Sequence, residues 1–160
     1  MKRYYIILIL LFLPTLVFAQ VKKIAILETV DKQGEISYAH KLMLRSNLSK
    51  AITNTEGFEA YDRTDIDAIV SEQDFQRTGL VSDDQIKQLG EMTGAAYILV
   101  AEAVKVDAQN MFITAKILNV ETAKTEMTDN LLMSTTPSDI QQGCENLANK
   151  LLGIRTSVTP

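Results

Sequence analysis

The sequence predicts an α/β (α+β) fold: a mixed sheet with a βαβ crossover followed by an antiparallel meander, with helices packed on the sheet. Near the start, a short apolar run, a long helical pattern and a second short run suggest a right-handed crossover between parallel strands. Between residues 96 and 134, three strand patterns are separated by short turns, which favours antiparallel pairing. With 160 residues and 46% hydrophobic residues, one domain is expected.

Residues 1–19 have the pattern of a secretory signal peptide. Lys2 and Arg3 precede an apolar run, and Val17 and Ala19 stand three residues and one residue before the expected cleavage point. The run is about 16 residues long, short of the ~20 that span a bilayer as a helix. A retained membrane anchor is the alternative. We therefore expect a signal peptide at 1–19, one domain at 20–153 and a flexible tail at 154–160.

Charge and cysteine content exclude several kinds of partner and site. Two of the 16 basic residues lie in the leader, so 14 basic residues face 20 acidic ones in the remainder, which makes nucleic acid an unsuitable partner. Cys144 is the single cysteine, so it forms no internal disulfide, and zinc would need clustered ligands. We expect Cys144 in the core.

The first half of the expected domain alternates strands and helices. Lys22 to Leu27 reads as a strand buried on both faces, and 28–35 as a loop. Ser37 is a candidate N-cap for a helix of about 18 residues that stops at Gly57. Its apolar stripe consists of Ala39, Leu42, Met43, Leu48, Ala51 and Ile52. A second strand follows at Phe58 to Tyr61, parallel to the first.

Two further helices are expected before the meander. Asp62 or Thr64 caps the first, whose apolar stripe is Ile66, Ile69 and Val70. Ser82 begins the second with a capping box that includes Gln85. Its inward side is Ile86, Leu89 and Met92, and Gly94 ends it.

The meander consists of strands at 96–106, 111–120 and 125–134. The middle strand alternates, with Met111, Ile113, Ala115 and Ile117 on one face and Phe112, Thr114, Lys116 and Leu118 on the other. Thr136 and Pro137 then begin a last helix as N-cap and N1 residues. Its core stripe consists of Ile140, Cys144, Leu147, Ala148 and Leu151.

No catalytic, cofactor or metal site is predicted. His40 is the single histidine, and its place in the first turns of a helix favours a surface or capping role. Asp62, Asp65 and Asp67 suit a helix N-terminus, whereas a calcium loop would need more oxygen ligands and a glycine. The first strand is followed by no glycine-rich phosphate loop. We therefore expect no enzyme activity and no cofactor.

The central stretch resembles the CsgG-type domain, found in the curli-secretion lipoprotein of Gram-negative outer membranes. It is also similar to domains in the lipoprotein activators of penicillin-binding proteins and to the N-terminal domain of the Tol-system β-propeller protein. The sequence segments that carry the resemblance are Asp62-Arg63, Ile69, Glu72-Gln73, Phe75-Gln76, Thr78-Gly79-Leu80, Leu89-Gly90 and Gly94 to Leu99. The resemblance continues through Phe112 to Ile117 and Val120 to Thr122.

The resemblance implies an exported, non-enzymatic binding or assembly module of the Gram-negative envelope. We expect a periplasmic location, with association with the outer membrane left open. The expected partner is an envelope or outer-membrane protein; the protein is not itself integral to the membrane, and homo-oligomerisation stays open. One alternative is a subunit of an oligomeric curli-type secretion assembly, although there is no lipidation cysteine. A small hydrolase or nucleotide-binding domain is the other.

The candidate partner-binding loop contains Phe75, Arg77, Gly79 and Leu80, because a loop with two large apolar residues either packs inward or contacts a partner. A second set of residues would form the structural signature of the family. This set is Asp62, Arg63, Glu72, Gln73 and Gly94.

Overall fold

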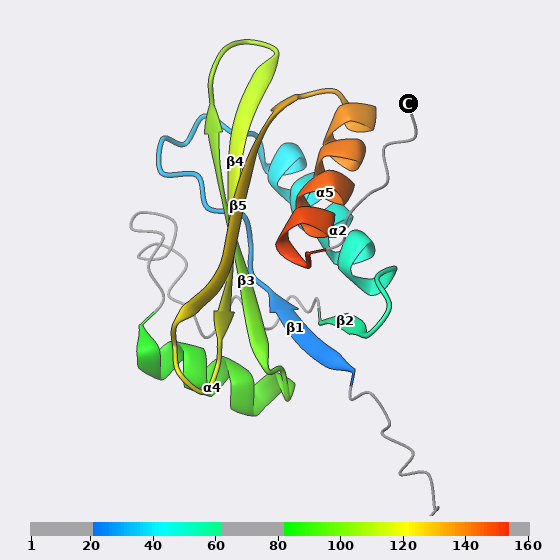
Figure 1. Ribbon diagram of the computed structural model, residues 1–160. Coiled ribbons are helices and arrows are strands. Elements are labelled where there is room, and N and C mark those ends of the chain that lie inside the picture. Colours follow the sequence, from blue (N-terminus) through cyan, green and yellow to red (C-terminus); the bar gives the residue numbers. More distant parts are fainter. Residues whose placement is uncertain (1–20, 62–81, 154–160) are drawn as a thin grey trace, which may run out of the picture.

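A five-stranded mixed sheet with helices on both faces forms the domain, which confirms the predicted fold class (Figure 1). The computed structural model describes residues 21–61 and 82–153. The strand order is β2-β1-β3-β4-β5. The strands are β1 (Lys22–Ile26), β2 (Phe58–Tyr61), β3 (Tyr97–Lys105), β4 (Asn110–Asn119) and β5 (Thr125–Ser134). The helices are α2 (Tyr38–Thr53), α4 (Asp83–Thr93) and α5 (Pro137–Leu151).

Strand β1 lies between two parallel neighbours. It pairs with β2 on one side and with β3 on the other, with Ile24 opposite both Ala60 and Tyr97. The β1–α2–β2 unit is therefore the expected crossover. Strands β3, β4 and β5 are antiparallel to one another and are joined by short turns, as the alternating pattern of β4 predicts.

One face of the sheet carries the larger core, beneath α2 and α5. The inward residues of β4 meet Ile26 of β1, Leu48 of α2 and Leu147 of α5, all of them buried. Helix α5 approaches β5 closely here, since a Cβ at Gly143 would lie 2.7 Å from Met133 Cε, the flexible end of that side chain. All five residues of the predicted α5 stripe are buried.

The other face is covered at one end by α4, which Figure 1 shows below the long β3–β4 hairpin. Ile86 and Leu89 of α4 pack on Ala25, Leu27 and Ile98. A capping box of Ser82 and Gln85 begins α4, as predicted, and Gly94 ends it in the left-handed conformation with φ 63°. The upper part of this face, toward the β3–β4 turn, extends beyond the helix (Figure 1).

Two helical stripes differ from their sequence prediction. Helix α2 has 16 residues and is buried through Leu44, Arg45, Leu48, Ala51 and Ile52, while Ala39 is exposed and Leu42 is 49% exposed. Apolar residues occur on most sides of this helix, so periodicity did not single out the buried one. In α4, Met92 is 56% exposed rather than inward, because the buried stripe runs through Ile86, Leu89, Gly90 and Thr93 and Met92 lies to one side of it. The helix predicted from Asp62 or Thr64 lies outside the described residues.

Candidate protein-binding surface

Within residues 21–61 and 82–153, no group of three or more His, Cys, Asp and Glu side chains could hold a metal ion. The side chain of Ser37 accepts a hydrogen bond from the His40 backbone N–H at 3.2 Å, so His40 contributes to the α2 cap through its main chain. His40 lines a hollow of about 220 Å³ together with Lys105 and Thr135. Glu35, Ser37 and Thr135 line the same hollow, and the Ser37 hydroxyl is engaged in the α2 cap rather than with the His40 ring.

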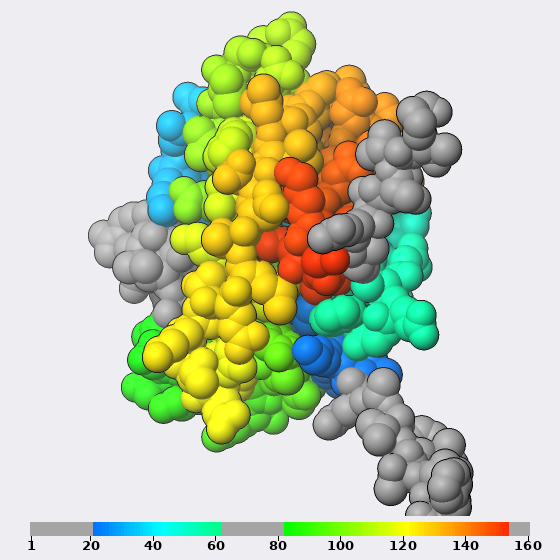
Figure 2. Space-filling model, viewed as in Figure 1, coloured from blue at the N-terminus to red at the C-terminus, as the bar shows by residue number. Residues whose placement is uncertain are grey.

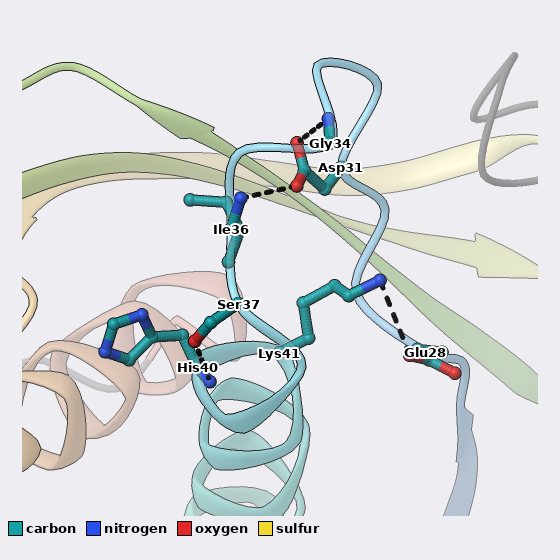
Figure 3. A network of polar contacts seen from close by, with 7 residues as sticks. All are labelled: Glu28, Asp31, Gly34, Ile36, Ser37, His40 and Lys41. Carbon is teal, nitrogen blue, oxygen red and sulfur yellow. Dashed lines mark hydrogen bonds and ion pairs between the residues drawn. The ribbon is translucent and has the colours of Figure 1, made fainter.

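The loop between β1 and α2 is fixed by one carboxylate. Asp31 is buried and accepts hydrogen bonds from the backbone N–H groups of Gln33 at 3.2 Å, Gly34 at 3.0 Å and Ile36 at 2.6 Å. Figure 3 shows Asp31 beneath the tip of the loop, with its two oxygens directed to different backbone nitrogens. Because the buried carboxylate satisfies the loop's own backbone, its role is to hold the loop in shape.

Ion pairs tie this loop to the elements beside it. Lys41 Nζ of α2 lies 3.8 Å from Glu28 Oε1, and in Figure 3 the two side chains point toward each other while the His40 ring points away. Lys32 Nζ lies 3.0 Å from Glu102 Oε2 of β3. Charges at this end of the sheet are therefore engaged within the protein, which favours a structural role over a charged substrate site.

An apolar row crosses the part of the sheet that α4 leaves uncovered. Val104, Phe112 and Leu132 stand opposite one another on three successive strands, in register. Phe112 is 36% exposed and Leu132 is 58% exposed. The neighbouring row is polar, formed by Glu102, Thr114 and Asn130. Large apolar side chains in register on an open sheet face are typical of a protein-binding surface.

The row ends at an unpaired strand edge. Strand β5 is ten residues long and pairs with β4 on one side, and no described segment pairs with it on the other. In Figure 2, β5 forms a yellow column along the front of the molecule with no coloured segment over it. Such an edge presents backbone donors and acceptors to any further strand.

Hydrogen-bond alternation shows which residues present those groups. The carbonyl of Asn110 accepts from Val106 N–H at 2.9 Å, so Asn110 is directed to β3, and the odd-numbered residues of β4 are directed to β5. Their β5 partners are odd-numbered as well, and the Thr135 N–H accordingly donates to the Gln109 carbonyl at 2.7 Å. The backbone groups of Thr128, Asn130 and Leu132 therefore point away from the sheet.

The residues predicted to bind a partner, Phe75, Arg77, Gly79 and Leu80, lie outside the described residues. So do Asp62, Arg63, Glu72 and Gln73 of the predicted family signature. Gly94 is described: it is the left-handed C-cap of α4 and lines a shallow hollow of about 530 Å³ with Gly90, Ala95, Ala96 and Val120.

The exposed row was not singled out from the sequence. Its signal was present in Leu131-Leu132-Met133, where three consecutive apolar residues interrupt alternation in an otherwise polar strand. Leu131 and Met133 face the core and Leu132 faces away from it. The predicted core position of Cys144 is confirmed, since the thiol is buried, lies 3.7 Å from the Leu44 carbonyl, and has its pKa raised by burial to about 12.

Comparison with known families confirms the resemblance found in the sequence. A family model described as "Curli production assembly/transport component CsgG" matches residues 35–111, which include α2, the whole of β3 and the start of β4. The chain is therefore CsgG-like over this segment. Among curated proteins, no sequence matches significantly.

Several solved structures share the fold. The LpoB C-terminal domain from Salmonella enterica has a TM-score of 0.52 at 11% identity, covering 71% of this chain and 82% of that one. A PelC dodecamer from Paraburkholderia phytofirmans has a TM-score of 0.54 at 9% identity, covering 85% and 87%. TolB from Acinetobacter baumannii has a TM-score of 0.54 at 12% identity, covering 88% of this chain and 30% of that one. At these identities the likeness shows the fold alone.

The structure is an α/β domain that is similar to CsgG over residues 35–111 and has a candidate protein-binding face. No helix within residues 21–61 and 82–153 has the length and apolar character needed to cross a membrane.

Proposed function

We propose that this protein is an exported, non-enzymatic accessory module of the Gram-negative cell envelope, which acts by binding an envelope or outer-membrane protein. The observation that carries the proposal is the CsgG family match over residues 35–111. It is supported by the open face, where Phe112 and Leu132 are exposed in register beside polar neighbours. The leader pattern at 1–19 supports export to the periplasm.

The binding surface of the described domain is the row Val104–Phe112–Leu132. Aromatic and aliphatic side chains at the centre of an interface contribute most of its affinity, and Phe112 is the large ring of this row. Replacing it with a charged residue removes the apolar contact and leaves a buried charge in the complex. The Phe112→Glu variant is therefore expected to bind its partner at least tenfold more weakly. A tenfold change in Kd corresponds to about 1.4 kcal/mol of binding free energy.

The test is a quantitative pull-down from a Gram-negative envelope extract, with the tagged full chain recovered from the periplasm. The matched control is Leu42→Glu on α2, an exposed apolar residue on another part of the domain. We expect one partner to be retained by the unaltered protein and by Leu42→Glu, and lost with Phe112→Glu. Recovery of no partner at any salt concentration would contradict the proposed function, and equal recovery with both variants would contradict the assigned surface.

A subunit of an oligomeric secretion assembly is the second candidate, favoured by the match to the CsgG family and by the dodecameric state of PelC, which shares the fold. Sedimentation of the protein with and without detergent separates the two. A ring-sized species, or one that requires detergent, would favour the assembly subunit. A small species that ignores detergent would favour the accessory module.

A further inference from the structure

The outer edge of β5 has an uneven charge distribution. Its first half contains Glu126 and Asp129, whereas the segment from Asn130 to Ser134 has no charged side chain. The Asn130 N–H points away from the sheet and donates a hydrogen bond to Asp129 Oδ1 at 2.7 Å. This local bond satisfies one outward donor, and the outward groups of Leu132 and Ser134 form no backbone hydrogen bond within the described part of the chain. The second half of β5 is therefore the part of the edge suited to another strand.

Charge also determines which register a second copy of β5 would adopt. An antiparallel pair centred on Asn130 would place the two Asp129 carboxylates about 7 Å apart along the strands, at 3.4 Å per residue. A pair centred on Leu132 would separate them by about 20 Å. The first separation is shorter than the screening length of about 8 Å at physiological salt, and the second is well beyond it. The register centred on Leu132 therefore avoids the repulsion.

In this register the apolar rows of two copies become continuous. Leu132 of one copy stands directly opposite Leu132 of the other, and Phe112 flanks each of them on β4. Directly opposed apolar side chains on one sheet face stabilise strand pairing. Leu132, the most exposed member of the row, gains a contact that it lacks in the single chain.

Helix α5 presents a compatible surface beside the edge. Lys150 Nζ lies 3.5 Å from Asp129 Oδ1, so the α5 stripe that includes Lys150 runs along β5. One and two turns earlier, this stripe contains the exposed amides Asn146 and Gln142. Amide side chains both donate and accept hydrogen bonds, so they are complementary to copies of themselves. Two α5 helices side by side would therefore meet without like-charge contact at these positions.

We propose that two copies of this chain pair antiparallel through β5, about a two-fold axis at Leu132, to form one continuous sheet. The pairing joins the Asn130 carbonyl of each copy to the Ser134 N–H of the other, since the Asn130 N–H is bonded to Asp129. It does not depend on the proposed function, because it needs no envelope partner. A dimer can form whether or not a pull-down recovers another protein.

Association is tested by sedimentation equilibrium of the chain expressed in full and recovered from the periplasm. We expect a monomer–dimer equilibrium that Leu132→Lys weakens at least tenfold, since like charges directly opposite each other destabilise strand pairs. The matched control Leu42→Lys should leave it unchanged. Ser134→Pro is a second test, because the Ser134 N–H points away from β4 and its loss leaves the internal ladder intact. Circular dichroism checks that each variant is folded.

The register is tested by crosslinking with a short bis-maleimide. Leu132→Cys should give a covalent dimer in high yield, whereas Thr128→Cys should not, because its two copies would lie about 27 Å apart along the strands. Cys144 is buried and contributes no background. A protein that stays monomeric at the highest concentration, a dimer that is unaffected by Leu132→Lys and Ser134→Pro, or preferential crosslinking of Thr128→Cys would each overturn the proposal.

Discussion

We expect the substitution of Gly by Ala to have opposite effects on the free energy of unfolding at two glycines in helix interiors, Gly90 and Gly143. A Cβ at Gly90 of α4 would overlap Val120 Cγ1 and lie 3.3 Å from Val120 Cβ. A Cβ at Gly143 of α5 would instead meet the end of the Met133 side chain, with Sδ at 3.0 Å. Both sites gain about 1 kcal/mol of helix propensity when Gly becomes Ala. Any difference in stability between the two variants must therefore come from the side chain that the new Cβ meets.

Val120 cannot move away easily. Its side chain is β-branched and stiff at χ1, and its backbone N–H donates to the Ala96 carbonyl at 3.0 Å. Overpacking at such a contact costs about 1–3 kcal/mol, which offsets or exceeds the propensity gain. Met133 has a flexible thioether that changes rotamer at low cost. We expect Gly90→Ala to lower the free energy of unfolding by up to about 2 kcal/mol and Gly143→Ala to leave it unchanged or raised by up to about 1 kcal/mol.

Urea unfolding of both variants, with the slope m held common, measures these changes. The double variant Gly90→Ala/Val120→Ala is the control, because it removes the overlapping methyl groups and should recover part of the loss. If Gly90→Ala stabilised the protein as much as an exposed helix site does, the packing argument for α4 would be refuted. An equal loss at Gly143 would refute the role given to side-chain flexibility.

Three further predictions concern single polar or ionisable groups. Asp31→Ala should cost about 2–3 kcal/mol in urea unfolding, because three backbone N–H groups lose a buried acceptor, and Asp31→Asn should cost less because it keeps one oxygen. Thr136→Ala should cost about 1 kcal/mol as a lost N-cap, and should raise the pKa of Asp139 measured by NMR, because the Thr136 hydroxyl is the largest cause of its lowered pKa. The pKa of the Cys144 thiol is raised to about 12, so the neutral thiol is favoured in the folded state. Its contribution to stability should be complete below about pH 9 and lost as pH rises toward 12, and alkylation at pH 8 should require unfolding; rapid labelling of the native protein would contradict its burial.

The meander and the last helix could be predicted from the sequence because each has one buried and one exposed side. In β4 every second residue from Met111 to Ile117 is buried, so the period of two is visible in the letters alone. The same holds for α5, whose stripe is apolar against a polar remainder. The buried side of helix α2 is harder to predict, since apolar residues such as Leu42 also occur on its exposed side. Periodicity identified the helix and the buried residues Leu48, Ala51 and Ile52, but wrongly placed Ala39 and Leu42 on the buried side.

The candidate surface could not be predicted because it depends on strand order. The sequence Thr125–Ser134 does not indicate that this strand lies at the edge of the sheet. Its edge position follows from the strand order: β1 lies between β2 and β3, and β5 has no outer neighbour among the described residues. In a central strand, the same ten residues would have Leu132 covered by a neighbouring element. The sequence favours the loop Phe75–Val81 instead, because it contains two large apolar residues, Phe75 and Leu80.

The position of β1 has a consequence for the order in which the domain assembles. It is the first strand in the chain, yet it is complete only when both its parallel neighbours are present, and Lys23 Nζ donates to the Thr93 carbonyl 70 residues away. The β3–β4–β5 hairpins and α5, by contrast, are contiguous in sequence and close early at low entropic cost. A chain that emerges from a translocation channel with its N-terminal end first would therefore stay extended there until its C-terminal half has followed. Pulse-labelled hydrogen exchange should show β4 protected before β1, and simultaneous protection would contradict this order.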